Sequence, residues 1–459
     1  MKRIESVYFI GVGGIGMSAI ARYFLSAGKF VAGYDRACSE LTERLVKEGA
    51  DIHYTEDVDL IPAVCLDKDT TLVVYTPAVP NDHRELVYFR TNGFRVEKRA
   101  QALGEITRMG RALCVAGTHG KTTTSTMVAH LLHQSGKGCN AFLGGISKNY
   151  GTNYLLSKQS EYVVVEADEF DRSFHALSPY VSVITSAEPD HLDIYGTKEA
   201  YLESFAHYTS LIESGGILIM HEGLEFSPRL KQGVTLYTYS RNSGDFHAQN
   251  IRVGGGDVIF DFVSPLGNIS NVRLGVPVLV NIENGIAAMA MAQLVGIPSE
   301  DIRQAMDSFG GVDRRFDFKI KRSDLAFLSD YAHHPSEIRE SALSIRALYS
   351  DKKITAVFQP HLYTRTRDFY LDFAHSLSLF DRVILLDIYP AREQPIEGVT
   401  SQLIYDCLAD NVDKQMCRKE ELIPLIENLK DIEVLVMLGA GDIEEYAPRV
   451  CEILLRKND

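Results

Sequence analysis

The chain has 459 residues, which is enough for about three domains of ~100–200 residues each. Lys and Arg number 47 against 61 Asp and Glu, and the resulting net charge of −14 argues against a nucleic-acid partner, because that binding needs a basic surface. Hydrophobic residues make up 45% of the chain and charged residues 24%, which is too apolar for a disordered protein.

The seven cysteines indicate a reducing compartment. Their number is odd and none forms a Cys-x-x-Cys pair, so neither a disulfide framework nor a zinc cluster is favoured, and we expect a cytoplasmic protein. Lys2 and Arg3 precede an apolar run at residues 7–17, as in a signal peptide, but the four glycines in this run have another explanation given below. Since no stretch reaches the ~18–20 apolar residues of a membrane span, we expect no membrane partner.

Short apolar runs alternate with helical patterns through most of the chain. The runs are rich in β-branched residues, which is typical of strands buried on both faces of a parallel sheet. They lie at residues 7–11, 72–75, 112–116, 162–166, 181–185, 354–358, 383–387 and 434–438. Residues 215–275 differ, because short alternating runs surround the turn at 254–257 and predict a small β insert.

Strand–helix units restart twice, and these restarts suggest the domain boundaries. One restart follows a predicted polar helix at 97–109, and the other follows Gly310-Gly311-Val312. We therefore predict an α/β protein of three domains: a Rossmann-like domain at 1–108, a central domain at 109–312 carrying the β insert, and a second Rossmann-like domain at 313–459.

The first glycine-rich loop follows the strand at 7–10. Gly11, Gly13 and Gly16 have the dinucleotide-binding spacing, with a helix predicted from about Met17 and Asp35 at the end of the next strand. The spacing provides a tight turn, close approach of the backbone to a diphosphate, and close helix–strand packing, next to a helix N-terminus that favours anions. The loop predicts a nucleotide with a diphosphate; the alternative is that its glycines serve packing alone.

A second phosphate loop follows the strand at 112–116 and leads into a helix predicted at 125–135. Its residues are Gly117, Thr118, His119, Gly120, Lys121, Thr122 and Thr123. Backbone N–H groups of such a loop cradle phosphates, Lys121 would reach the β- and γ-phosphates, and the Thr122 hydroxyl would ligate Mg²⁺. Residue 115 is Val rather than Gly, so the loop is shorter than the usual form on its N-terminal side. Two phosphate loops about 105 residues apart imply two different phosphorylated ligands.

Acidic and histidine-rich loops follow four further strands. Glu166 ends the strand at 162–165, where a carboxylate near a phosphate loop holds Mg²⁺, and His191 follows the next strand as a metal ligand or phosphate contact. Towards the C-terminus, residues 330–335 and 359–367 carry His333 and His361 at strand ends, where open α/β sheets bind ligands. The alternative for each cluster is a solvated surface loop.

Together these residues resemble the Mur ligases, the ATP-dependent amino-acid ligases of peptidoglycan precursor synthesis, over essentially the whole chain. The carriers are Gly-Val-Gly-Gly-Ile-Gly-Met-Ser at 11–18, Gly-Thr-His-Gly-Lys-Thr-Thr-Thr at 117–124, Glu-Ala-Asp-Glu at 166–169, Glu-Pro-Asp-His-Leu-Asp at 188–193, Tyr-Ala-His-His-Pro at 331–335 and Gly-Ala-Gly-Asp-Ile at 439–443. The resemblance is strongest to the branch that adds L-alanine. It implies that ATP phosphorylates the carboxylate of UDP-N-acetylmuramate and that L-alanine then attacks the acyl phosphate.

The resemblance also implies residue roles. The UDP-sugar would contact Gly11, Gly13, Gly14, Gly16, Met17, Ser18 and Asp35. ATP would contact residues 117–123, Asn281, Asn284, Arg315 and Asp330, and two Mg²⁺ ions (or Mn²⁺) would use Thr122, Glu166 and His191. The amino acid and the muramoyl carboxylate would face Tyr331, His333, His361 and Arg365, with His333 assisting the amine to lose its proton. Val280 and Leu362 depart from the family, where many relatives have His and Arg.

Small molecules are thus the expected partners: UDP-N-acetylmuramate, L-alanine and ATP, bound by a monomer or homodimer. Three alternatives stay open at this point. The first is a related ligase that adds another amino acid or a peptide, since glycine or serine needs nearly the same pocket. The second is a nicotinamide-dependent oxidoreductase, which leaves the loop at 117–124 unexplained. The third is a P-loop switch or scaffold, which leaves the first loop unexplained.

Overall fold

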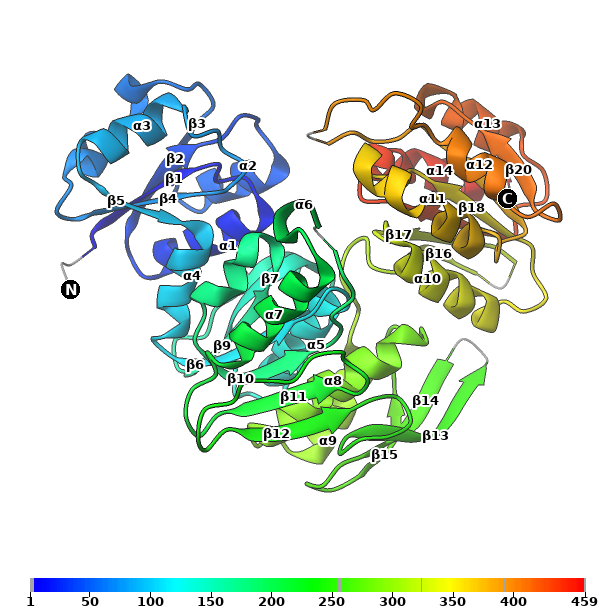
Figure 1. Ribbon diagram of the computed structural model, residues 1–459, viewed down its shortest axis with the longest axis horizontal. Coiled ribbons are helices and arrows are strands. Elements are labelled where there is room, and N and C mark those ends of the chain that lie inside the picture. The colour runs from blue at the N-terminus through cyan, green and yellow to red at the C-terminus, as the bar shows by residue number, and fades with distance from the viewer. Residues whose placement is uncertain (1–3, 191, 255–256, 323, 392, 458–459) are drawn as a thin grey trace. The chain divides into compact units, whose positions relative to one another are not determined.

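The computed structural model describes residues 4–190, 192–254, 257–322, 324–391 and 393–457 (Figure 1). The chain divides into two compact units. The first comprises Met1–Gln249, Asp261–Val272 and Glu283–Phe309, and the second comprises Asn250–Phe260, Arg273–Ile282 and Gly310–Asp459. Each unit is built on parallel sheets flanked by helices, so the α/β prediction is confirmed.

The first unit begins with a five-stranded parallel sheet. Its strands are β1 (Ser6–Ile10), β2 (Phe30–Tyr34), β3 (Asp51–His53), β4 (Thr71–Tyr75) and β5 (Arg95–Lys98). The order is β3-β2-β1-β4-β5, so the chain returns across β1 after β3. This is the Rossmann order, and the loop after β1 lies where the strand order reverses, the place where open α/β sheets bind ligands.

Four helices connect these strands, and two begin where the sequence patterns did not place them. They are α1 (Ile15–Ser26), α2 (Glu40–Lys47), α3 (Arg84–Thr91) and α4 (Arg99–Thr107). Helix α1 begins two residues before Met17. The helix predicted at 97–109 is shorter, because Arg95–Lys98 pairs with β4 as a strand in which Arg95 and Glu97 join on one face at 2.8 Å.

The central sheet of the first unit has seven strands. They are β6 (Arg111–Ala116), β7 (Asn140–Ser147), β8 (Thr152–Leu155), β9 (Tyr162–Ala167), β10 (Pro179–Ile184), β11 (Ile217–His221) and β12 (Thr235–Tyr239). The order is β12-β11-β10-β6-β9-β7-β8, with only β8 antiparallel among the pairings described. Because β9 and β10 flank β6, the segments after all three strands meet at one edge of the sheet.

Helices surround this central sheet, and a small sheet follows it in the chain. The helices are α5 (Lys121–Gln134), α6 (Leu192–Tyr195), α7 (Lys198–Thr209), α8 (Val280–Leu294) and α9 (Ser299–Ser308). The small sheet has the order β13-β14-β15, with β13 at His247–Gly254, β14 at Asp257–Val263 and β15 at Ile269–Arg273. The β insert predicted at 215–275 corresponds to this small sheet only in its later part, because β11 and β12 belong to the central sheet. Gly255 and Gly256 of its predicted turn lie outside the described residues.

Helix α1 joins the two large sheets of the first unit, packing on β1 and also on β7 and β8 (Figure 1). The buried side chain of Asn153 on β8 accepts a hydrogen bond from Arg22 on α1 at 2.6 Å. Its amide donates to the carbonyl oxygen of Ile15 at 2.5 Å and to Ser18 Oγ at 3.1 Å. Asn153 of the central sheet therefore holds the first turn of α1 in place through these hydrogen bonds.

The second unit contains a six-stranded sheet. Its strands are β16 (Asp317–Lys321), β17 (Ala326–Asp330), β18 (Ile354–Phe358), β19 (Arg382–Leu385), β20 (Asp413–Met416) and β21 (Val434–Leu438), in the order β16-β17-β21-β18-β19-β20. Only β16 is antiparallel among these pairings. The helices are α10 (Pro335–Leu348), α11 (Tyr363–Leu377), α12 (Gln402–Cys407), α13 (Leu422–Asn428) and α14 (Ala447–Lys457).

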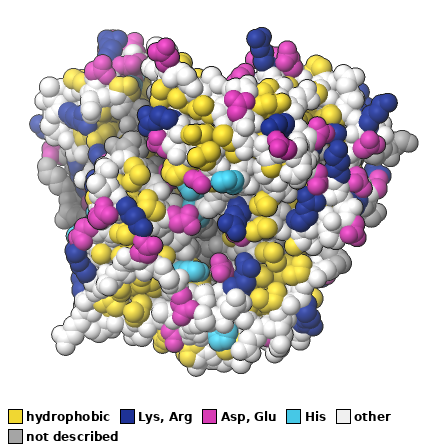
Figure 2. Space-filling view, turned by 45° about the vertical axis from the view of Figure 1, so that its right-hand side comes forward, with side chains coloured by type: hydrophobic (Ala, Val, Ile, Leu, Met, Phe, Trp, Pro, Cys, Tyr) yellow, Lys and Arg dark blue, Asp and Glu magenta, His cyan; other side chains and the backbone are white. Residues whose placement is uncertain are grey.

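Three general features concern the described chain as a whole. Within the described residues, no helix combines the length and apolarity that a membrane crossing requires. Figure 2 shows basic and acidic side chains interspersed over the face in view. All seven cysteines carry free thiols.

Candidate active site

The loop after β1 is held by Asp35. The Gly13 N–H donates to Asp35 Oδ2 at 2.6 Å, and the Ala37 N–H donates to Oδ1 at 3.3 Å. A Cβ added at Gly13 would lie 2.9 Å from the Asp35 carboxylate, so a side chain would displace it. The structure thus places the Asp35 carboxylate beside the glycine loop.

Helix α1 begins directly after this loop. Its N-cap, Gly14, makes no side-chain capping hydrogen bond, and the first turn contains no acidic residue, so the turn presents backbone donors and a positive dipole end. Met17 and Ser18 are buried, and Ser18 Oγ donates to the Ile15 carbonyl oxygen at 3.0 Å. In this structure both residues support the turn from inside.

Gly16 has a different surrounding from the one its motif suggests. The sequence pattern assigned the third glycine to close helix–strand packing. The atoms nearest to a Cβ added at Gly16 would instead belong to the side chain of Arg99, with Nη1 at 2.5 Å. Gly16 therefore makes room for a guanidinium over the first turn of α1.

The second phosphate loop joins β6 to α5, which begins at Lys121 rather than Ser125. Gly120 caps the helix with a left-handed φ of 81°, and a Cβ there would lie 2.6 Å from Asn284 Oδ1. Segments after β10 fix the rest of the loop: Ser186 Oγ accepts from the His119 N–H at 2.8 Å. Thr118 Oγ1 donates to the Glu188 carbonyl oxygen at 2.7 Å and lies 2.8 Å from the Tyr201 hydroxyl.

Lys121 is held by a buried carboxylate that the sequence patterns did not single out. Its Nζ lies 2.8 Å from Glu169 Oε2 and donates to the carbonyl oxygens of Gly117 at 2.6 Å and Thr118 at 3.1 Å. Burial alone would lower the pKa of Lys121, but Glu169 and the neighbouring carboxylates raise it overall. The lysine is therefore a fixed positive charge inside the phosphate loop.

Glu166 lies at the end of β9, beside β6, and Thr122 is buried in the first turn of α5. Glu166 Oε2 is buried without a hydrogen-bond partner, and a Cβ on Gly144 would collide with it. A buried carboxylate oxygen normally has a partner, so this oxygen fits a cation that completes its coordination. The residues present thus fit a divalent metal ion.

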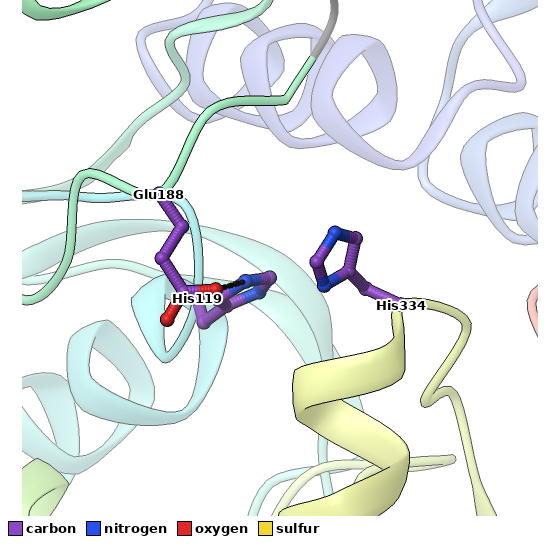
Figure 3. A group of neighbouring side chains, drawn as sticks. All are labelled: His119, Glu188 and His334. Atoms are coloured by element: carbon purple, nitrogen blue, oxygen red, sulfur yellow. Dashed lines mark ion pairs between the residues drawn. The ribbon is translucent and has the colours of Figure 1, made fainter. Parts of the chain in front are cut away.

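The segment after β10 also reaches the phosphate loop. His119 Nε2 lies 3.3 Å from Glu188 Oε2 (Figure 3). His191, the predicted metal ligand of this segment, lies outside the described residues. On α8, Asn284 Oδ1 accepts from Thr124 Oγ1 at 3.2 Å, next to Gly120, whereas Asn281 is buried and donates to the Val276 carbonyl oxygen.

A cavity of about 160 Å³ lies in the first unit between α1 and the end of β9. Gly16 lines it from the first turn of α1, and Glu166 lines it from the end of β9. Arg99 and Asp168, which lie 2.9 Å apart, also line it. The cavity therefore reaches from the first turn of α1 to the carboxylates at the end of β9.

In the second unit, five of the predicted residues gather at the ends of β17 and β18. The guanidinium of Arg315 stacks over the Tyr331 ring at 4.8 Å, and the rings of His333 and His361 lie 5.8 Å apart. His361 Nδ1 accepts from Arg365 at 3.4 Å. Asp330 belongs to β17 rather than following it, and it accepts from the Phe316 N–H at 3.2 Å and from Ser341.

His333 is held as a neutral imidazole. Nδ1 donates to the Tyr331 carbonyl oxygen at 2.8 Å, which leaves Nε2 as the acceptor. Burial lowers the pKa of His333 to about 4, although Glu337 opposes this shift. Leu362 next to this group has a φ of 70°, an uncommon conformation for a branched side chain.

The order of the first sheet and the loops of the second place the chain among the α/β nucleotide-binding folds. Three family models match it in succession: "Mur ligase family, catalytic domain" at residues 6–111, "Mur ligase middle domain" at 115–292 and "Mur ligase, glutamate ligase domain" at 314–441. The chain belongs to the Mur ligase family, and the resemblance inferred from its motifs is confirmed.

Several relatives match this chain over essentially its whole length. The UDP-N-acetylmuramate–L-alanine ligase of Phocaeicola vulgatus is 68% identical over 457 residues and covers 100% of both chains. That of Parabacteroides distasonis is 58% identical over 458 residues, covering 100% of this chain and 99% of the relative. The solved UDP-N-acetylmuramate–alanine ligase of Thermotoga maritima has a TM-score of 0.81 at 28% identity, covering 98% of this chain and 99% of that one. A murein peptide ligase from Psychrobacter arcticus shares the fold, with a TM-score of 0.69 at 22% identity.

Proposed function

We propose that the chain joins L-alanine to the carboxylate of UDP-N-acetylmuramate at the expense of ATP, giving ADP and phosphate, in peptidoglycan precursor synthesis. The full-length relatives named for this reaction support the proposal. The observation that carries it structurally is the cavity lined by both Gly16 and Glu166. A sugar nucleotide held by the first loop can extend its carboxylate through this space towards the second.

ATP solves the problem that a carboxylate is a poor acylating group. The muramoyl carboxylate would attack the γ-phosphate in line, forming an acyl phosphate and releasing ADP. Lys121, already ionised and fixed by Glu169, would neutralise charge on the transferring phosphoryl group. The backbone N–H groups of residues 117–123 would hold the phosphates.

Glu166 and Thr122 are the described residues that would hold Mg²⁺, or Mn²⁺ in its place. The unpartnered Glu166 Oε2 supports this assignment. When bound, the metal supplies positive charge that orients the phosphates and lowers the barrier for attack. A second ion would have His191 as one of its ligands.

In the second step the L-alanine amine attacks the acyl carbon and phosphate leaves. Tyr331, His333, His361 and Arg365 would face the amino acid and the muramoyl carboxylate. His333, kept neutral by burial, would accept a hydrogen bond from the amine through Nε2. A pKa of about 4 makes its imidazole a weak base, so its contribution would be orientation of the amine more than removal of its proton.

The remaining assignments complete the proposal. Residues Gly11, Gly13, Gly14, Gly16, Met17, Ser18 and Asp35 would form the UDP-sugar site, the last through the ribose. Asn281, Asn284, Arg315 and Asp330 would serve ATP. We also propose domain boundaries at 1–108, 109–312 and 313–459, a monomer or homodimer in the cytoplasm, and neither nucleic acid nor membrane as a partner.

Phosphate release from ATP tests the proposal. The assay combines enzyme, Mg²⁺-ATP and UDP-N-acetylmuramate with one amino acid at a time, and mass spectrometry follows the product. Release that requires both the sugar nucleotide and L-alanine is expected, with glycine and L-serine slower. Release that is independent of the sugar nucleotide would contradict the proposal, and release that prefers another amino acid would reassign the second substrate.

A further inference from the structure

Arg99 occupies an unusual position in the first unit. It is the first residue of α4, and its guanidinium lies over Gly16 in the first turn of α1. Any side chain at residue 16 would displace it, because Nη1 would lie 2.5 Å from the added Cβ. The glycine motif of the first loop thus ends in a residue that admits a cation from another helix.

This position is electrostatically unfavourable for a cation. The N-terminal end of a helix carries partial positive charge, and Arg99 stands at the N-termini of both α1 and α4. Neither helix has an acidic residue in its first turn. Within the described residues, the ion pair recorded for Arg99 is with Asp168, at 2.9 Å. Asp168 is therefore the ion-pair partner of a guanidinium that also stands beside two helix N-termini.

The cavity shows where a further anion would sit. Among the described residues that line it, Arg99 is the only cationic side chain, and Asp168 and Glu166 are the carboxylates. Gly16 and Ile15 line its other side from the first turn of α1. An anion in this cavity would meet the guanidinium and the α1 dipole together, and a diphosphate supplies the charge and the planar oxygen pairs that a guanidinium binds.

We propose that Arg99 is a substrate-binding residue that contacts the diphosphate of the sugar nucleotide, and that Asp168 holds its guanidinium in place until this ligand arrives. The inference rests on the proposed function and names a residue that the glycine motif does not contain. Gly16 is small so that this cation reaches the diphosphate. Asp168 competes with the ligand for the same guanidinium.

UDP binding measured by calorimetry tests the assignment without any ligation step. For Arg99→Ala we expect UDP affinity to fall about 10- to 100-fold, as for loss of one charge-assisted hydrogen-bonding group. Arg99→Lys should recover part of the loss. Uridine, which has no phosphate, should bind the wild type and Arg99→Ala alike. Lys98→Ala is the matched control, because Lys98 pairs with Asp171 at 3.3 Å but does not line the cavity.

Asp168→Asn distinguishes substrate binding from a structural ion pair. The amide keeps an oxygen for the Phe170 N–H, which donates to Asp168 Oδ1 at 3.1 Å, and removes only the charge. If the Arg99–Asp168 ion pair were merely structural, Arg99→Ala and Asp168→Asn would both weaken UDP binding. If Arg99 binds the diphosphate, Asp168→Asn should leave UDP affinity unchanged or higher, while Arg99→Ala lowers it.

Four results would overturn the inference. They are UDP affinity unchanged in Arg99→Ala, an equal loss for uridine, an equal loss in Asp168→Asn, or a loss confined to UDP-N-acetylmuramate that spares UDP. The last would move Arg99 to the muramoyl carboxylate. Circular dichroism and the melting temperature of each variant show whether it folds, and Arg99→Lys replaces Arg99→Ala if the alanine variant does not. A wild type that binds no UDP would count against the proposed function itself.

Discussion

The ammonium of Lys121 lies 2.8 Å from Glu169, and Glu169 lies three residues beyond Glu166 in the chain. The end of β9 and the residues directly after it therefore supply both the carboxylate with an unpartnered oxygen and the counter-ion of the phosphate-loop lysine. Lys121 is ordered and charged before any phosphate arrives. This arrangement lowers the cost of organising the loop when ATP binds.

Lys121→Ala should reduce phosphate release at least about 100-fold, since it removes a charge aimed at the transferring group. UDP binding should stay within twofold, because the first loop is elsewhere. Glu169→Gln should raise the KM for ATP, because the buried lysine loses its counter-ion. Lys198→Ala, which breaks an exposed ion pair with Glu225, is the control and should leave both values unchanged. Normal turnover in Lys121→Ala would rule out the phosphate-loop assignment.

Glu166→Gln tests the metal assignment. The amide is isosteric but a poor ligand for a divalent cation, so we expect turnover to collapse even at high Mg²⁺. In the wild type, chelation by EDTA should abolish phosphate release, and Mg²⁺ or Mn²⁺ should restore it. Turnover of Glu166→Gln that saturates at wild-type Mg²⁺ concentrations would show that this carboxylate holds no metal.

These residues also show how far sequence reasoning reaches. The two glycine loops were predictable because their conformation depends on local backbone requirements, as at Gly120 with its φ of 81°. The ion pairs of Glu169 and Arg99 were not, because they join residues 48 and 69 positions apart whose proximity depends on strand order. Glu169 belongs to the acidic run at 166–169, which was the available signal; Arg99 carried none. The start of α4 was misplaced because Glu97 and Lys98 are polar residues that also suit a helix surface, whereas here they belong to β5 and pair with β4.

Because His130 is buried, we expect the protein to lose stability in acid. It is buried on α5, with Nδ1 2.7 Å from the Tyr150 hydroxyl and Nε2 3.0 Å from Ser308 Oγ. Burial lowers the pKa of His130 to about 4 from 6.5. Between these values the unfolded chain binds the proton more readily, so the free energy of unfolding should fall as the pH drops from about 6.5 towards 4, by up to about 3 kcal/mol.

Denaturant unfolding at several pH values measures this effect. The quantity to follow is the unfolding free energy of the first unit, which contains His130. His130→Gln should remove most of the dependence assigned to this residue. Tyr150→Phe is the control, because it removes a hydrogen bond from the His130 ring but leaves the titrating imidazole in place. The loss of unfolding free energy in this variant should therefore be nearly the same at every pH between about 4 and 6.5. A wild-type slope that survives in His130→Gln would locate the acid sensitivity elsewhere.

Asn153→Ala should weaken the link between the central sheet and α1. The change leaves the buried Arg22 guanidinium and the Ile15 carbonyl oxygen without these partners, at a cost of about 1–3 kcal/mol in unfolding free energy. We also expect weaker UDP binding, because the first turn of α1 loses its support. Thr152→Ala is the matched control, because Thr152 Oγ1 lies 3.4 Å from Arg22 Nη1 and its hydrogen bond there is weak. Unchanged stability and UDP affinity in Asn153→Ala would show that α1 needs no such support.

The fate of the carboxylate oxygen tests the central claim most directly. UDP-N-acetylmuramate labelled with ¹⁸O in its carboxylate is incubated with enzyme, Mg²⁺-ATP and L-alanine, and the released phosphate is analysed by mass spectrometry. An acyl phosphate transfers one carboxylate oxygen to phosphate, so we predict one ¹⁸O atom in each phosphate, matched by one molecule of alanylated product. Phosphate without the label, or product formed without phosphate, would contradict the account.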